Sequence, residues 1–368
     1  MMWSNKNTTF LRVKIKWNVL ICLAAFSAYS SLLNARVDLR KGLPRGHPDF
    51  MSLLSQDNQG DLGICYSYAS TAMIHHYLLY LNGGQDFDFR ISPLALAIQM
   101  KAYLEAQDPQ HSDIHYPPQF ATNYRKVNFG WIRYVLDALN EKGYSYPRDF
   151  DQGLARLDPI PEDAAKHYID RLFYYFSHRK NKRQNVLKNT LAFIEERSFK
   201  KELPLSERHL KHAFSNNSYI NYLNELLEMT MPEDRIKLPF IRYDYFSRFN
   251  QGSDLREDLL TRVHERLNLG GKTQPIGVRY CSNFLYEREE TPGLEGYFSE
   301  SDADKNPCNM HVSLIIGMRS IKRRNQLLVR DSYGKSCEGY QFECENGNLW
   351  IDEETFSHQI NSITYIVP

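Results

Sequence analysis

A short polar turn that runs into a cysteine constrains this chain more than any other stretch. Residues 57–69 read Asp-Asn-Gln-Gly-Asp-Leu-Gly-Ile-Cys-Tyr-Ser-Tyr-Ala, and apolar or small residues then recur at helical spacing as far as Leu81. The spacing predicts a helix over residues 65–81 with Cys65 at its N-terminus. Backbone N–H groups and the positive end of the helix dipole favour a thiolate there, which makes a cysteine nucleophilic. The alternative is a buried, inert cysteine.

The first 35 residues read as an export signal. Basic residues between positions 6 and 16 precede an apolar core at residues 17–33, and small residues follow up to Ala35. An apolar run this short favours a cleaved signal peptide over a membrane span, with a retained N-terminal anchor as the alternative. We therefore expect an exported chain, periplasmic or secreted, without membrane contact after cleavage.

The composition indicates a globular chain with a sizeable core. Hydrophobic residues make up 42% and aromatic residues 13% of the 368 residues. A net charge of +1 gives no strong attraction to nucleic acid, so we expect no nucleic-acid partner.

The cysteines beyond Cys65 form an even set. After the export signal these are Cys281, Cys308, Cys337 and Cys344. Four cysteines in an exported chain can form two disulfides in any of three connectivities. We predict the pairs Cys281–Cys308 and Cys337–Cys344. Antiparallel strands would bring the first pair together, and the second pair is close enough in sequence to staple a hairpin.

A histidine and an aspartate mark two neighbouring strands near the C-terminus. His311 lies at the head of an apolar strand over residues 310–317, and Asp331 lies in the next strand, over residues 327–334. Adjacent antiparallel strands can place the two side chains together at one end. A histidine in this position is more often structural when it is considered alone.

Together these stretches resemble the papain family of cysteine peptidases. The pattern Gln-Gly-x-x-Gly-x-Cys matches the family's spacing from glutamine to cysteine, here Gln59 to Cys65, and the strands with His311 and Asp331 follow in the family's chain order. The resemblance covers most of residues 56–146 and 275–340. Asp331 stands where the family has asparagine, and Tyr333 stands where the family has a tryptophan that shields the histidine.

The resemblance implies an α+β fold of two lobes. A helical lobe over residues 36–150 would carry the nucleophile, and an antiparallel β-barrel lobe over residues 269–368 would carry the histidine. Residues 151–268 depart from the family pattern, and we expect a helical insertion there. Its predicted helices cover residues 161–178, 184–197, 207–214, 219–228 and 254–267. Too few residues precede Gln59 for a long pro-segment, so the chain looks like a divergent bacterial-type member.

The resemblance also implies the chemistry of acyl transfer on a polypeptide substrate. Cys65 would attack the carbonyl carbon, while the Cys65 N–H and the Gln59 amide would hold the oxyanion. His311 would protonate the leaving amine, with Asp331 as its orienting group. No cofactor is implied, and a protein inhibitor is a further candidate partner.

Four more residues are expected to contact the substrate. The resemblance implies that Gly130 hydrogen-bonds the substrate backbone. Ile132, Met310 and Val312 would line the main specificity pocket, which suggests a preference for an apolar side chain.

Two other functions fit part of the pattern. A transglutaminase-like acyltransferase or hydrolase also uses cysteine, histidine and aspartate in this order, but Gln59 at papain spacing argues against it. A papain-like fold that only binds would be supported by loss of Cys65, His311 or Gln59, and all three are present. The scattered histidines, such as His75 with His76 and His111 with His115, have no third ligand at a convincing spacing, so no metal site is predicted.

Overall fold

The computed structural model covers the whole chain and describes residues 37–40, 59, 62–84, 90–107, 127, 130–158, 160–181, 185–197, 205–231, 234–248, 255–286 and 309–368. The predicted export signal, residues 1–35, lies outside these ranges, as do His111 and His115. Within the described ranges, no helix combines the length and the apolar character needed to cross a bilayer.

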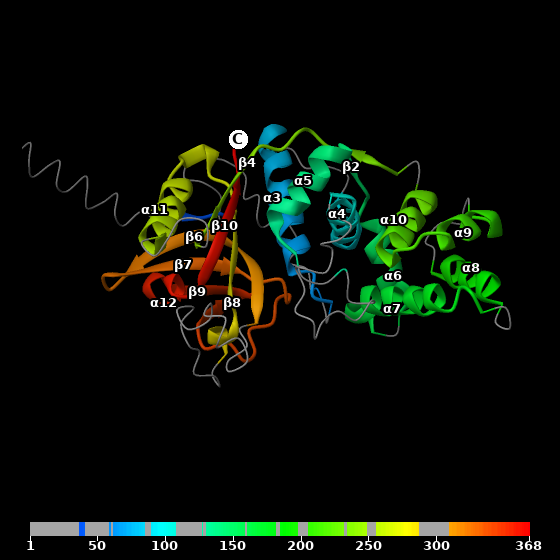
Figure 1. The fold of residues 1–368 in the computed structure, drawn as a ribbon. Helices are drawn as coiled ribbons and strands as arrows, with labels where there is room; N and C mark the ends of the chain where they lie inside the picture. The colour runs from blue at the N-terminus through cyan, green and yellow to red at the C-terminus, as the bar shows by residue number, and fades with distance from the viewer. Residues whose placement is uncertain are drawn as a thin grey trace, which may run out of the picture.

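The cysteine helix α3 (Cys65–Leu81) lies at the centre of the molecule, between the β-sheet and the helices that run from α4 to α10 (Figure 1). It contacts the sheet on one side and helices α4 (Pro93–Gln107) and α5 (Ile132–Lys142) on the other. The predicted bounds of α3, residues 65–81, are confirmed. Its position explains why the helix is buried nearly all round instead of on one stripe.

Small hydroxyl residues allow α3 to be buried on several faces. Ser70 and Thr71 donate hydrogen bonds to the carbonyl oxygens of Tyr66 and Ser67, at 2.7 Å and 2.8 Å. Ser67 in turn donates to the Pro93 carbonyl at 2.5 Å. Each buried hydroxyl is therefore satisfied, as a buried polar group must be.

Local signals set the ends of the neighbouring helices. Ser92 caps α4, because its hydroxyl oxygen accepts a hydrogen bond from the Ala95 N–H at 2.9 Å. Pro93 is the first helical residue, a position that proline favours because its fixed φ suits the helix and its missing N–H would have no partner there. Helix α5 ends at Gly143, which adopts a left-handed conformation with φ of 70° that glycine accommodates without strain.

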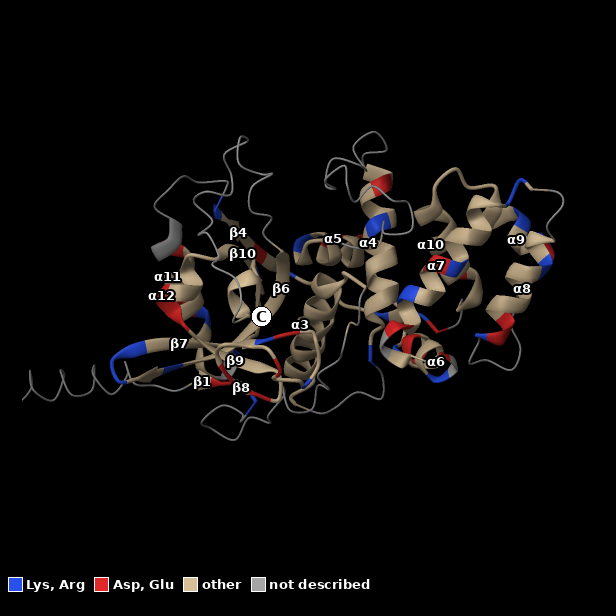
Figure 2. Ribbon diagram, turned by 90° about the horizontal axis from the view of Figure 1, so that it is seen from below, with Lys and Arg blue, Asp and Glu red and all other residues tan. Residues whose placement is uncertain are grey.

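The next helices form a unit on the far side of α4 from the sheet (Figure 1). Aromatic side chains fill its interior, including the stacked pair Phe214 and Tyr222 with ring centroids 5.1 Å apart. Acidic and basic residues are mixed along these helices (Figure 2), as expected of solvated helix faces. The elements are α6 (Asp149–Leu157), the 3-10 helix η3 (Pro161–Asp163), α7 (Ala164–Ser177), α8 (Val186–Glu196), α9 (Glu207–Phe214) and α10 (Tyr219–Thr230).

The second half of the molecule is an antiparallel sheet. Its strands are β1 (Val37–Asp38), β4 (Tyr243–Ser247), β5 (Ile276–Cys281), β6 (Met310–Ile321), β7 (Arg324–Arg330), β8 (Glu343–Glu345), β9 (Asn348–Asp352) and β10 (Ile360–Ile366). The strand order is β4-β10-β5-β6-β7-β9-β8, with β1 paired to β6. Over the described residues this path is open at β4 and β8. A short separate sheet joins β2 (Tyr144–Ser145) and β3 (Ile236–Lys237).

Strand β6 separates two hydrophobic cores. Val312 and Leu314 belong to the core that also contains the helix residues, whereas Ile315 belongs to a second core on the other side of the sheet. Helices α11 (Leu255–Leu267) and α12 (Glu353–Ser357) cover that second core, flanked by the 3-10 helices η5 (Gly270–Lys272) and η6 (Asn283–Leu285). The alternation of side chains along one strand thus links the nucleophile helix to the sheet.

The region predicted as a helical insertion, residues 151–268, contains two elements that belong with the sheet. Strand β4 pairs with β10 at the sheet edge, and α11 packs against the second core. The sequence analysis predicts helices over residues 219–228 and 254–267 and no strand between them, where β4 lies. The pairing of β4 with β10 is a tertiary contact that local periodicity does not encode.

One predicted disulfide is confirmed. Cys337 and Cys344 are bonded and staple the loop between β7 and β8. Cys281 is also disulfide-bonded, while its predicted partner Cys308 lies outside the described residues. Cys65 is the free cysteine of the described part of the chain.

Tyr66 connects α3 to the segment that precedes α5. Its ring is fully buried, and its hydroxyl donates a hydrogen bond to the Val127 carbonyl oxygen at 2.6 Å. A Cβ atom on Gly130 would come within 2.7 Å of this ring and of the Met100 side chain. Only glycine therefore fits at position 130 without displacing its neighbours.

We expect Tyr66→Phe to destabilise the protein by about 1–3 kcal/mol, because the buried Val127 carbonyl would lose its donor. Urea unfolding measures the change. Tyr80→Phe on the same helix is the matched control, since Tyr80 is partly buried and its hydroxyl has no hydrogen bond among the described residues. Equal stability of the two variants would contradict the structural role of Tyr66.

Candidate active site

The nucleophile candidate is the first residue of α3. Cys65 is buried, with 8% of its surface exposed, and Ile64 before it supplies no side-chain cap to the helix. The backbone N–H groups of the first helical residues have no acceptor within their own helix. The sulfur therefore lies beside unpaired donors at the positive end of the helix.

His311 lies opposite, on the second residue of β6. Its Nε2 atom is 2.7 Å from Oδ1 of Asp331, which directly follows β7. An ionised carboxylate only accepts hydrogen bonds, so Nε2 carries the proton. The other ring nitrogen is then available for Cys65, whose sulfur is near enough to act on the pKa of His311. The structure thus brings together Cys65, His311 and Asp331.

Three donors surround the buried carboxylate of Asp331. Besides His311, the Tyr340 hydroxyl donates at 2.9 Å and the Ser332 backbone N–H at 2.6 Å. Burial alone would raise the pKa of Asp331, but the His311 charge and these hydrogen bonds hold that pKa below its ordinary value. Asp331 is therefore ionised at neutral pH.

The pKa of His311 shifts in the opposite direction, upward. Burial alone would lower the pKa of His311, but the charges of Asp331 and Cys65 and a side-chain hydrogen bond with each raise it from 6.5 to about 10. His311 is therefore an imidazolium at neutral pH, placed between the Asp331 carboxylate and the Cys65 sulfur.

Two tyrosines fix the plane of the imidazole. Tyr333 stacks on the His311 ring with centroids 5.1 Å apart and 8° between the planes, and Tyr280 meets the ring edge at 5.9 Å. Tyr333 is 41% exposed, so it covers the imidazole on the solvent side. It thus takes the shielding position that the sequence assigns to it.

Gln59 is joined to the same site through Ser332. The Ser332 hydroxyl donates to the Gln59 side-chain oxygen at 2.6 Å, and the Gln59 N–H donates to the Ser332 carbonyl at 3.0 Å. The hydrogen bond from Ser332 identifies the oxygen end of the Gln59 amide. The other end is the NH2 group, which donates hydrogen bonds. Such an orientation suits a donor to a developing oxyanion.

The predicted substrate contacts separate into two groups. Ile132 and Val312 line a small cavity between the start of α5 and the sheet. Gly130 borders Tyr66 and Met100. Met310 pairs with Cys281 at the head of β6 and is not part of the cavity wall.

The same cavity contains a residue that the sequence analysis missed. Arg279 of β5 lines it, and its guanidinium lies over the Trp131 ring, 4.0 Å from the centroid. An arginine in the otherwise apolar strand 276–281 is the signal that could have identified it. Ser332 and Tyr340, which hold Gln59 and Asp331, were missed as well. Their roles depend on contacts between distant segments.

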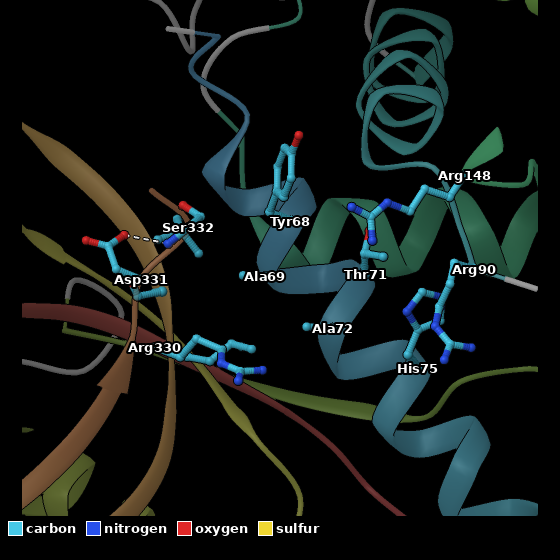
Figure 3. A pocket seen from close by; sticks show the side chains of 13 residues that line it. Tyr68, Ala69, Thr71, Ala72, His75, Arg90, Arg148, Arg330, Asp331 and Ser332 are labelled. Atoms are coloured by element: carbon cyan, nitrogen blue, oxygen red, sulfur yellow. Dashed lines mark hydrogen bonds between the residues drawn. The ribbon is translucent and has the colours of Figure 1, made fainter. Parts of the chain in front are cut away.

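A second cavity lies between α3 and strands β6 and β7 (Figure 3). The small residues Ala69 and Ala72 leave space on the α3 side. Arg330 extends from β7 toward α3, while Arg90 and Arg148 approach from the side of α4. Asp331 and Ser332 form part of the wall, so this basic cavity adjoins the candidate site.

Among the described residues, no group of three or more metal-ligating side chains is close enough to hold a metal ion. His75 and His76 make other contacts. His75 Nε2 accepts a hydrogen bond from the Ile91 N–H at 2.8 Å, and His76 Nδ1 is 2.8 Å from the Gln274 side-chain oxygen. Burial lowers the pKa of His76 to about 4, against the effect of the Gln274 hydrogen bond, so this histidine is neutral.

No protein-family profile matches the chain, and no curated protein matches it. Among solved structures, the chain is similar to the bromelain protease from Ananas comosus, solved in complex with the E64 inhibitor. The two chains are 13% identical with a TM-score of 0.41, and the alignment covers 90% of this chain and 98% of that one. A likeness of this size establishes neither a family nor an activity.

We expect Asp331→Asn to lower the pKa of His311, because the variant removes the opposite charge beside the imidazolium. The loss of one close charge typically moves a pKa by about one to three pH units. The His311 Cε1–H signal, followed by NMR from acid to alkaline pH, measures this directly. In the wild type, His311 contributes stability that is fully present below about pH 6.5 and is lost as the pH rises toward about 10.

Asp352→Asn is the control for this experiment. Asp352 lies in the same sheet, at the end of β9, and its carboxylate accepts a hydrogen bond from Gln326. The control should leave the His311 titration in place. A His311 pKa that stays constant or rises in Asp331→Asn would show that Asp331 is not its charge partner.

Proposed function

We propose that this protein is a cysteine peptidase that hydrolyses peptide bonds with Cys65 as nucleophile. The observation that carries the proposal is the position of His311. It is hydrogen-bonded to the Asp331 carboxylate and interacts electrostatically with Cys65, and Cys65 begins a helix. Such an arrangement of nucleophile, base and orienting group is what acyl transfer requires.

The proposed reaction has two stages. The Cys65 thiolate attacks the carbonyl carbon of the peptide, and the oxyanion accepts hydrogen bonds from the Cys65 N–H and the Gln59 amide. The C–N bond then breaks as His311 gives its proton to the leaving amine, which leaves a thioester. Water, deprotonated by His311, attacks the thioester, releases the new carboxylic acid and restores Cys65.

Asp331 has a positioning role in this scheme. Its hydrogen bond to Nε2 holds the ring with the other nitrogen toward Cys65. Its charge favours the imidazolium, which the first proton transfer needs. Gly130, Ile132 and Val312 would contact the substrate near the scissile bond, while Met310 would act at the rim of the site.

Two alternatives share the thiol chemistry or the fold. A transglutaminase-like enzyme would pass the acyl group to an amine instead of water. A binding protein without activity would not need an ionised pair around a free thiol, and the raised pKa of His311, which Asp331 and Cys65 cause, favours an enzyme. The orientation of Gln59 by Ser332 favours a peptidase over the acyltransferase, because it presents a side-chain donor for the oxyanion.

The proposed location is outside the cytoplasm. The disulfide between Cys337 and Cys344 supports an oxidising compartment. Cleavage of residues 1–35 as a signal peptide belongs to this proposal. Polypeptides would be the substrates, and a protein inhibitor is a candidate partner.

We expect an epoxide reagent to alkylate Cys65, because a thiolate opens an epoxide ring whereas disulfide sulfurs do not react. Mass spectrometry of the purified mature chain locates the adduct. The same preparation should cleave unstructured protein substrates. Cys65→Ala should lose both the adduct and at least about a thousandfold in cleavage rate.

Supplying a primary amine distinguishes the acyltransferase. A peptidase yields the free acid as its main product, whereas an acyltransferase yields the amide. Absence of both the adduct and cleavage, in a chain whose unfolding transition is normal, would contradict the enzyme and leave the binding protein.

A further inference from the structure

The cavity beside Cys65 has one charged residue in its wall. Four strands and one helix start surround it, and the register places Arg279 opposite Ser362 on β10 and Val312 on β6. Gly277, opposite Thr364, lets the Ile132 side chain pack directly against β5, because a Cβ atom at position 277 would lie 2.1 Å from the Ile132 Cδ1 atom. The lining residues are Trp131, Ile132, Tyr245, Gly277, Arg279, Val312, Ser362 and Thr364.

Arg279 is a largely buried arginine without a carboxylate partner among the described residues. Across the residues that the structure describes, its guanidinium forms no ion pair with a carboxylate. Burial lowers the pKa of Arg279 from 12.5 to about 10, and the charges of Tyr245 and Cys65 oppose that change. The residue stays protonated at neutral pH while it is partly removed from water, which is costly unless a partner compensates.

The contact with Trp131 leaves the donors of Arg279 available. A guanidinium that lies over an aromatic ring uses its flat face for the contact. Its N–H groups point outward in the plane, in the fork that matches the two oxygens of a carboxylate. The aromatic ring thus holds the arginine in place without occupying its hydrogen-bonding edge.

A second arginine adds positive charge beside this cavity. Arg133 lies over the Tyr245 ring at 4.5 Å and near the Trp131 ring at 5.1 Å. Its Nε atom is buried and has no hydrogen-bond partner among the described residues. Two guanidinium groups therefore flank Trp131, and Ser362 and Thr364 add hydroxyl groups to the wall.

We propose that this cavity binds an acidic side chain of the substrate, aspartate or glutamate, through Arg279. The inference rests on the proposed peptidase function and names the substrate class of that site. The cavity lies near the nucleophile, because Arg279 in its wall is near enough to interact electrostatically with Cys65, and β6, the strand that carries His311, supplies Val312 to the wall. The acidic residue would lie near the scissile bond. An apolar side chain there would leave the guanidinium without a counter-charge.

Peptides that differ at a single position, with each position next to the scissile bond varied in turn, test the inference. We expect kcat/KM to be roughly 10- to 100-fold higher with glutamate than with the isosteric glutamine, the range for a hydrogen bond to a charged group. Leucine should be no better than glutamine. In Arg279→Gln this preference should disappear, and in Arg279→Glu the best peptide should carry arginine or lysine.

Arg262→Gln is the matched control. Arg262 also lies over an aromatic ring, Phe246 at 3.9 Å, but outside the cavity. This variant should keep the glutamate preference. An unfolding transition for each variant shows whether it is folded, and Arg279→Gln keeps the test valid if Arg279→Glu does not fold.

Binding to the inactive Cys65→Ala chain separates the two hypotheses. Fluorescence anisotropy with the glutamate and glutamine peptides, labelled at one end, measures affinity without catalysis. Tighter binding of the glutamate peptide, lost when Arg279→Gln is added to Cys65→Ala, supports the acidic site. This conclusion holds even if the wild type cleaves no peptide, because lack of cleavage would refute only the peptidase. Equal affinities, no binding of either peptide, or a wild type that cleaves the leucine peptide best would overturn the acidic site.

Discussion

Asp331 is buried, with 2% of its surface exposed. The candidate site is arranged so that other groups compensate the negative charge of its carboxylate. An isolated buried charge costs several kcal/mol, and removing one partner of a buried pair is strongly destabilising. Here the compensation comes from β6 through His311, from the next backbone N–H, and from Tyr340. Tyr340 lies in the loop closed by the Cys337–Cys344 disulfide, so the staple also limits the motion of a donor to this carboxylate.

The same aspartate connects the sheet to the oxyanion side of the site. Ser332, the residue after Asp331, bonds both the side chain and the backbone of Gln59. A displacement of Asp331 would therefore disturb two sets of hydrogen bonds, those that hold His311 and those that hold Gln59. Stability and the proposed chemistry thus depend on one short segment, residues 331–332, because the polar contacts of two site residues converge there.

The nucleophile reaches this segment through packing. Helix α3 is covered by the sheet on one side and by α4 and α5 on the other, and small residues such as Ala69 and Ala72 lie at the interface with β6 and β7. Burial of α3 fixes where its first residue lies relative to His311. The helical unit α6–α10 lies on the far side of α4 and contributes none of the three site residues.

Local patterns were enough to predict much of the framework. The helix from Cys65 and the Cys337–Cys344 bond follow from periodicity and short sequence separation. These features depend on neighbouring residues, whose interactions the sequence displays directly. The adjacency of His311 and Asp331 also followed, since two strands joined by a short turn pair with each other.

The sequence by itself therefore determined the helix that presents Cys65 and the strand pair that carries His311 and Asp331. Only the tertiary structure decided that Ser332 holds Gln59, 273 positions away, and that Tyr340 supports Asp331. It also decided that Arg279 lies over Trp131 in the cavity beside Cys65. Alternation along a strand shows which side chains share a face, but not which distant segment covers that face, so these contacts have no local signature.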